Sequence, residues 1–187
     1  VTGGTASGSG VDYTFAADEV TIAAGTDPPQ ATLAVMINGD EIYENSETIE
    51  ITLDPDGGGI TNATTATALH TVTINENDDP PAVGFTETEG SVLEGSTASD
   101  ITFEIDAVSG LPVVITYSTS DDVAEAGSDY TALTAETATI PVGQTQKTIS
   151  LVTTHDLIDE ADETLLITIS SATNSGIDSE KQVQTFT

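Results

Sequence analysis

The sequence predicts an all-β protein made of tandem antiparallel β-sandwiches of the immunoglobulin-like kind. Apolar and polar residues alternate with a period of two in six stretches, and no segment has the apolar spacing of an amphipathic helix. Thr, Val and Ile dominate these stretches, and branching at Cβ suits a pleated sheet. The predicted strands are residues 31–37, 48–53, 70–74, 100–105, 147–152 and 164–169.

Clusters of turn-forming residues separate the predicted strands. Asp, Pro and Gly fill residues 54–59, and Ser109, Gly110 and Pro112 form a second cluster. Gly and Pro favour turns, and Pro cannot donate to a strand ladder, so each cluster ends a strand. The strands are therefore short, as in an antiparallel sandwich.

An internal repeat divides the chain into two modules. Asp12-Tyr13-Thr14 recurs as Asp129-Tyr130-Thr131, and the acidic stretch 40–47 recurs as 156–163. The boundary falls in the run 77–81, where two prolines favour an extended linker. We therefore expect one repeat in residues 1–79 and a second in residues 80–187.

Composition excludes several functional classes. The chain has 187 residues with 32 acidic and 2 basic side chains, giving a net charge of −30. Nucleic acids and anionic membrane surfaces are excluded as partners, because both require Lys and Arg. Cysteine is absent, which excludes disulfides and thiolate chemistry, and no apolar run is long enough to insert into a membrane. His70 and His155 have no nucleophile pattern beside them, so we do not expect an enzyme.

The charge also points toward a metal. Two carboxylates about 5 Å apart repel by roughly 3 kcal/mol at an effective dielectric constant near 20. Loops gather at the ends of a sandwich, so acidic residues that are remote in sequence can converge there. Calcium prefers six to eight oxygen ligands from such groups. Clustered carboxylates are therefore expected to hold Ca²⁺.

Ordered motifs across nearly the whole chain make it resemble the Calx-beta domain family. The second repeat contains Val92-Leu93-Glu94-Gly95, then Ala126-Gly127-Ser128-Asp129-Tyr130, then the acidic loop 156–163. The first repeat contains Asp12-Tyr13, the acidic loop 40–47 and an Asp cluster that ends at Asp79. The family occurs in sodium–calcium exchanger regulatory loops, an integrin tail and bacterial surface proteins.

The resemblance implies a set of calcium ligands in each repeat. In the second repeat they would be Glu94, Asp129, Asp156 and Glu160. In the first repeat they would be Asp12, Asp40, Glu44, Asp78 and Asp79. The two tyrosines that follow the repeated Asp are expected to pack into the core, with their hydroxyl groups bonded to the backbone.

The first repeat is expected to be incomplete. Val1 aligns with Ser118, so the first repeat lacks a counterpart of Glu94 and of the strands that precede Ser118. Residues 183–187 fall inside the expected last strand of the second repeat, which indicates a segment of a longer array. We expect the first repeat either to be loosely packed or to exchange strands with another copy of the chain.

Three functions fit these observations. The first is a calcium-binding structural module of an extracellular or cell-surface, adhesin-like protein, in which Ca²⁺ rigidifies the loops and the joint between neighbouring repeats. The second is a calcium-sensing regulatory domain of an exchanger-like transporter, located in the cytoplasm. The third is a metal-free acidic spacer or protein-interaction module.

Overall fold

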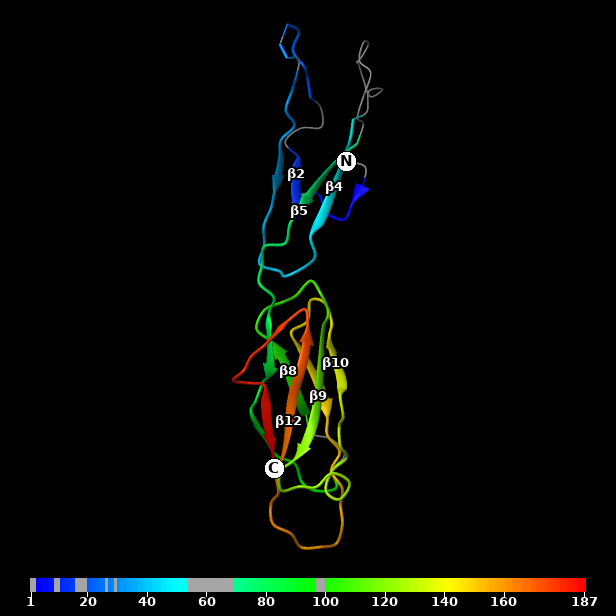
Figure 1. The fold of residues 1–187 in the computed structure, drawn as a ribbon, viewed down its shortest axis with the longest axis vertical. Coiled ribbons are helices and arrows are strands. Elements are labelled where there is room, and N and C mark those ends of the chain that lie inside the picture. Colours follow the sequence, from blue (N-terminus) through cyan, green and yellow to red (C-terminus); the bar gives the residue numbers. More distant parts are fainter. Residues whose placement is uncertain are drawn as a thin grey trace. The chain divides into compact units, whose positions relative to one another are not determined.

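The computed structural model describes residues 3–8, 11–15, 20–25, 27–28, 30–53, 69–96 and 100–187. The predicted turn cluster 54–59 lies outside the described residues. The chain divides into two compact units (Figure 1). Unit 1 comprises residues 1–41 and 45–77, and unit 2 comprises residues 42–44 and 78–187. The described residues form no helix that could cross a membrane.

Unit 2 contains two β-sheets. The larger sheet has the strand order β10-β9-β12-β14-β7, and the smaller one has the order β11-β8-β6-β13. The strands of the larger sheet are β7 (Glu89–Gly90), β9 (Val113–Asp121), β10 (Glu136–Ile140), β12 (Leu165–Thr173) and β14 (Val183–Phe186). The strands of the smaller sheet are β6 (Ala82–Phe85), β8 (Asp100–Ile105), β11 (Gln146–Ser150) and β13 (Gly176–Ile177).

Most neighbouring strands of unit 2 are antiparallel. The longest pairing joins β9 to β12, with Leu165 opposite Asp121 and an irregularity between Ile169 and Ser171. Two short pairings are parallel: β13 with β6, and β14 with β7. Thus a strand near the beginning of unit 2 lies beside its last strand.

Alternate residues of the long strands form the core of unit 2. In β9 the buried side chains are Val113, Ile115 and Tyr117, and in β12 they fall at every second position from Leu165 to Ile169. The smaller sheet contributes five buried side chains, namely Val83, Phe85, Ile101, Phe103 and Ile105. Because a strand presents every second residue to one face, the period of two in the sequence becomes one apolar layer.

Unit 1 has a much smaller core. Its described strands are β1 (Gly3–Gly4), β2 (Tyr13–Phe15), β3 (Val35–Ile37), β4 (Glu47–Thr52) and β5 (Leu69–Ile74). They form a sheet of order β1-β4-β5 and a separate β2-β3 pair. Among its described apolar side chains only Tyr13 and Ile49 are buried, whereas Ile22 and Leu53 are 56% and 58% exposed. Burial of the described residues therefore stabilises unit 1 far less than unit 2.

The structure confirms the all-β class. The predicted strands correspond to β3, β4, β5, β8, β11 and β12, and all except β8 have shifted ends. The first of them is shorter than predicted, because only Val35–Ile37 pairs with β2. The linker prediction is wrong for Pro81. This residue is buried within unit 2, and its carbonyl oxygen accepts hydrogen bonds from the Gly176 amide and the Ser175 hydroxyl.

Candidate metal centres

A cavity of about 580 Å³ in unit 2 collects acidic side chains from three parts of the second repeat. One comes from the segment after β7, one from the turn after β9 and the others from the loop before β12. Its acidic lining residues are Glu94, Asp129, Asp156, Asp159, Glu160, Asp162 and Glu163. All four residues predicted for this repeat therefore lie at one cavity.

Asp129 is placed at this cavity by a tight turn. Its amide donates to the Glu125 carbonyl oxygen at 2.9 Å, and its Oδ2 accepts the Glu125 amide at 2.7 Å. Gly127 lies inside the turn with φ +93°, a conformation that favours glycine. The Asp129 carbonyl oxygen also accepts the Thr154 amide at 2.8 Å, which joins this turn to the start of the acidic loop.

The acidic loop 156–163 begins with a local turn of its own. Asp156 Oδ1 accepts the Ile158 amide at 2.7 Å, an arrangement that Asp commonly adopts in turns. The loop is exposed from Asp156 to Asp162, and the Leu157 side chain is 97% exposed. Its acidic side chains therefore face solvent or the cavity.

Glu94 lies beside a histidine at the edge of the cavity. The Glu94 Oε1 and His155 Nδ1 atoms are 3.3 Å apart, and both side chains are more than half exposed. Gly95 next to Glu94 has φ +71°, and a Cβ there would lie 2.7 Å from the His155 Cβ. Glycine is thus required where these two segments approach each other.

Two carboxyl groups at the cavity, those of Glu160 and Glu163, have a raised pKa. Partial desolvation raises the pKa of Glu160, and the charges of Asp156, Asp129 and Glu94 raise it further. Desolvation likewise raises the pKa of Glu163, together with the charges of Asp129, Glu160 and Glu125 and a hydrogen bond to Asp129. A nearby negative charge disfavours the ionised form of a carboxyl group. The raised pKa values therefore show that the electrostatic potential in the cavity is negative.

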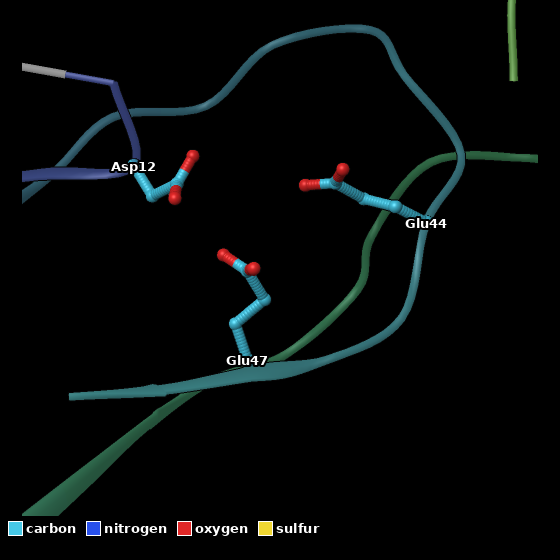
Figure 2. Close-up of side chains that lie close together, drawn as sticks. All are labelled: Asp12, Glu44 and Glu47. Carbon is cyan, nitrogen blue, oxygen red and sulfur yellow. The ribbon is translucent and has the colours of Figure 1, made fainter. Parts of the chain in front are cut away.

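The first repeat brings three carboxylates closer together. Asp12, Glu44 and Glu47 each offer an oxygen, and these oxygens all lie within 4.8 Å of one another. Figure 2 shows the three side chains pointing toward one another. Asp12 directly precedes β2, Glu47 begins β4, and Glu44 lies in the loop between β3 and β4. Asp12 Oδ2 also accepts the Ser7 amide, which resembles the turn around Asp129.

Three residues predicted for the first repeat do not belong to this group. Asp40, Asp78 and Asp79 are described by the structure but are not part of the Asp12–Glu44–Glu47 cluster. Asp40 and Asp79 are exposed and Asp78 is partly exposed. A role for these three in binding a metal stays a prediction from the resemblance.

Asp159 and Asp162 at the cavity were not predicted as ligands, and two further acidic residues that were missed are related by the repeat. Glu47 joins the cluster of the first repeat, and Glu163 lies at the cavity of the second. They are counterparts, because Glu47 precedes Thr48 as Glu163 precedes Thr164 in the aligned acidic loops. The alignment of the two repeats could therefore have identified both glutamates as candidate ligands.

The tyrosines after the repeated Asp are buried as predicted. Tyr13 is 7% exposed and Tyr130 is 1% exposed. The expected bond to the backbone is wrong for Tyr130, whose hydroxyl donates to the Asp121 carboxylate at 2.6 Å. A buried hydroxyl needs a partner, and here a side chain that ends β9 supplies it.

The donor sets suit a hard divalent cation. Both sites offer carboxylate oxygens, whereas the described residues contain no cysteine and only two histidines, which is the donor chemistry of calcium rather than of softer metals. Two ligands of one calcium ion lie no more than about 5 Å apart, given Ca–O distances of 2.3–2.6 Å. The first-repeat cluster meets this limit. Among the described residues of the second repeat, no three acidic oxygens do, so its loop acids would have to approach one another around an ion.

Sequence and fold comparisons point to one family. A model of the Calx-beta domain matches residues 1–78 and again residues 76–185. No curated protein matches the chain.

Solved structures of Calx domains resemble the fold, among them the following three. The apo-form Calx CBD1 domain is 16% identical, with a TM-score of 0.53, and the match covers 58% of this chain and 95% of that one. The Calx CBD2 domain is 13% identical, with a TM-score of 0.50, covering 56% and 83%. The CBD12 tandem from CALX1.2 is 15% identical, with a TM-score of 0.50, and covers 89% of this chain and 82% of that one.

Proposed function

Because the chain belongs to the Calx-beta domain family, we propose that it is a calcium-binding tandem module with one site in each repeat. The observation that carries the proposal is the convergence of Glu94, Asp129, Asp156 and Glu160 on one cavity. The Asp12–Glu44–Glu47 cluster supports a second site in the first repeat.

Calcium supplies positive charge that offsets the repulsion among these carboxylates. The residues of the chain supply the oxygen ligands and hold them in place. The turn at Asp129 and the Asp156 turn present oxygens toward the cavity, and Glu160 and Glu163 add charge from the exposed loop. Ligands that bind only the native form stabilise it, so calcium should stabilise the acidic loops and the fold.

We propose that this binding has a structural purpose in an extracellular or cell-surface, adhesin-like protein. A net charge of −30 and the absence of cysteine suit surroundings where calcium is abundant and weak sites are still filled. A dissociation constant of about 10⁻⁴–10⁻³ M is typical of extracellular modules.

A regulatory role in an exchanger-like transporter is the second candidate. It is favoured by the resemblance to the CBD12 tandem from CALX1.2, which extends over 89% of the chain. A sensor would require a dissociation constant of about 10⁻⁷–10⁻⁵ M. Affinity therefore separates the two candidates.

Thermal unfolding of the whole chain in chelator and in calcium tests the proposed function. At a calcium concentration 100 times the dissociation constant, the native state gains about 2.7 kcal/mol per site. We expect the midpoint to rise with calcium and to rise much less with magnesium, which demands a near-ideal octahedral site. An unchanged midpoint would favour a metal-free acidic spacer, and isothermal titration calorimetry then gives the affinity.

Strand exchange between two copies is a further proposal, and it concerns unit 1. Ile22 and Leu53 are exposed there, whereas their counterparts in unit 2, Ile140 and Ile169, are buried. Strands from a second copy could cover these positions. Light scattering on a size-exclusion column should then show a dimer, and a compact monomer at all concentrations would contradict the exchange.

A further inference from the structure

Asp121 makes hydrogen bonds that no calcium ligand set requires. It ends β9, and its Oδ1 accepts both the Tyr130 hydroxyl at 2.6 Å and the Ala126 amide at 2.9 Å. Asp121 does not line the acidic cavity. The hydrogen bonds of Asp121 therefore hold the backbone beside the cavity, and Asp121 itself is not placed to bind an ion.

The two bonds of Asp121 hold both ends of the turn that presents Asp129. Ala126 follows Glu125, whose amide and carbonyl oxygen are bonded to Asp129. Tyr130 follows Asp129 directly, and its ring is 1% exposed. With Ala126 and Tyr130 both attached to one oxygen, the backbone on either side of Asp129 is fixed. A charged acceptor makes each bond stronger than a neutral one would be.

In the described part of the first repeat, a glycine stands at the position equivalent to Asp121. Gly4 is opposite Ile49 in β4, just as Asp121 is opposite Leu165 in β12. The Thr48 carbonyl oxygen accepts the Thr5 and Ala6 amides, and the Thr164 carbonyl oxygen accepts those of Val123 and Ala124, so the second repeat has one more residue between the strand and these bonds. The strand pairing itself aligns Gly4 with Asp121. The glycine therefore occupies the place of Asp121.

A side chain at Gly4 would not fit. Gly4 has φ +113°, and a Cβ there would lie 2.1 Å from the Thr48 carbonyl oxygen. A carboxylate cannot reach Tyr13 from this position without a change in the backbone. Among the described residues, the arrangement around Asp121 is thus found in the second repeat and has no equivalent at Gly4.

We propose that Asp121 is a positioning residue for calcium in the second repeat, where it holds Asp129 ready to bind through Tyr130 and the Ala126 amide. This inference rests on the proposed function. It deepens that function by separating the two repeats: the second-repeat site depends on Asp121, and the first-repeat site does not. The first repeat therefore serves as a control within the same molecule.

Calcium titration calorimetry on four forms of the whole chain tests the proposal. Asp121→Ala removes the acceptor, and we expect the second-repeat site to lose about 10- to 100-fold in affinity, as when groups that orient metal ligands are removed. Asp121→Asn keeps an acceptor oxygen at the same place without the charge, and we expect affinity within about threefold of the unaltered chain. Asp122→Asn removes a neighbouring charge and should also have little effect.

A measurement without calcium checks the hydrogen bonds themselves. Hydrogen exchange of the Ala126 amide in chelator should be faster in Asp121→Ala than in the unaltered chain and close to normal in Asp121→Asn. Tyr130→Phe keeps the buried ring but removes the hydroxyl, and we expect an intermediate loss of affinity. This variant tests the proposal even if Asp121→Ala unfolds unit 2.

The outcomes separate this proposal from the proposed function. Absence of calcium binding by the unaltered chain overturns both. Normal binding by Asp121→Ala and Tyr130→Phe overturns the positioning role alone. Equal losses in Asp121→Ala and Asp121→Asn would overturn it too, because they would show that the charge of Asp121 matters and its hydrogen bonds do not.

Discussion

Glu47 and Glu163 hold the same place in the two repeats, and each lies beside the aspartate that precedes the repeated tyrosine. Glu47 has an oxygen within 4.8 Å of an Asp12 oxygen, and Glu163 lies close enough to Asp129 for that residue to raise the pKa of Glu163. Each glutamate comes directly before a threonine whose carbonyl oxygen binds two amides of the opposite segment. The same Asp–Glu pair is therefore built twice in one chain.

The first prediction concerns this pair. Glu163→Gln should lower calcium affinity in the second repeat by about tenfold or more, because affinity depends on the number of charged ligands. Glu47→Gln should do the same in the first repeat. Glu104→Gln is the control, since Glu104 lies on β8 and accepts a hydrogen bond from Gln146 away from both sites. Calorimetry that gives equal affinities for all three variants would contradict the prediction.

The second prediction concerns the acidic loop. Asp156→Asn should weaken calcium binding in the second repeat, because it removes a charge and keeps the acceptor for the Ile158 amide. Asp178→Asn is a matched control: Asp178 Oδ1 accepts the Glu180 amide in the same type of turn and does not line the cavity. If both variants bind calcium alike in a titration, Asp156 is not a ligand.

The third prediction concerns calcium binding and pH. The pKa values of Glu160 and Glu163 are raised above 4.5, so protons compete with calcium as the pH falls toward the ordinary carboxyl range. We expect tighter binding at pH 7 than near pH 5, with protons released on binding near pH 5. Titrations in two buffers of different ionisation enthalpy measure that release. A heat that does not depend on the buffer would contradict the prediction.

The fourth prediction concerns stability and pH in chelator. A carboxyl group with a raised pKa in the folded state binds protons more tightly there than in the unfolded chain. Its contribution is therefore favourable at low pH and is lost as the pH rises through the raised pKa. Glu160→Gln should make the fall in melting temperature above pH 4.5 less steep. An identical slope in the variant would show that the raised pKa has no effect on folding.

The fifth prediction concerns the two cores. Ile167 on β12 is fully buried, so Ile167→Ala should destabilise unit 2 by about 2–5 kcal/mol. Ile49→Ala should affect only unit 1, which we expect to unfold at the lower denaturant concentration. Denaturation followed by NMR signals from each unit tests this. A single transition shared by both units would contradict the prediction.

Much of the fold could be predicted because its strands alternate. Residues 100–105 were predicted with the observed bounds of β8, and the period of two leads directly to the buried face. Strand β9 was missed, although Val113, Ile115 and Tyr117 alternate in the same way. The two-residue strands β1, β7 and β13 have no local pattern, because only pairing in the folded chain defines them.

The site could be predicted in part. The repeated Asp-Tyr and the acidic loops identified Asp129, Asp156 and Glu160, which the fold places at one cavity. Asp121 could not be recognised in this way, because its importance depends on where the Tyr130 hydroxyl lies in space. Asp40, Asp78 and Asp79 were selected by the motif alone.

The parallel pairing of β7 with β14 has a mechanical consequence. The Thr185 amide donates to the Thr88 carbonyl oxygen, the Thr187 amide to Gly90, and the Val92 amide back to Thr187. When the two ends of unit 2 are pulled in opposite directions, parallel neighbours slide along each other, so these bonds share the tension instead of opening one by one. Unit 2 should therefore resist a force applied between its two ends better than it would if β7 and β14 were antiparallel.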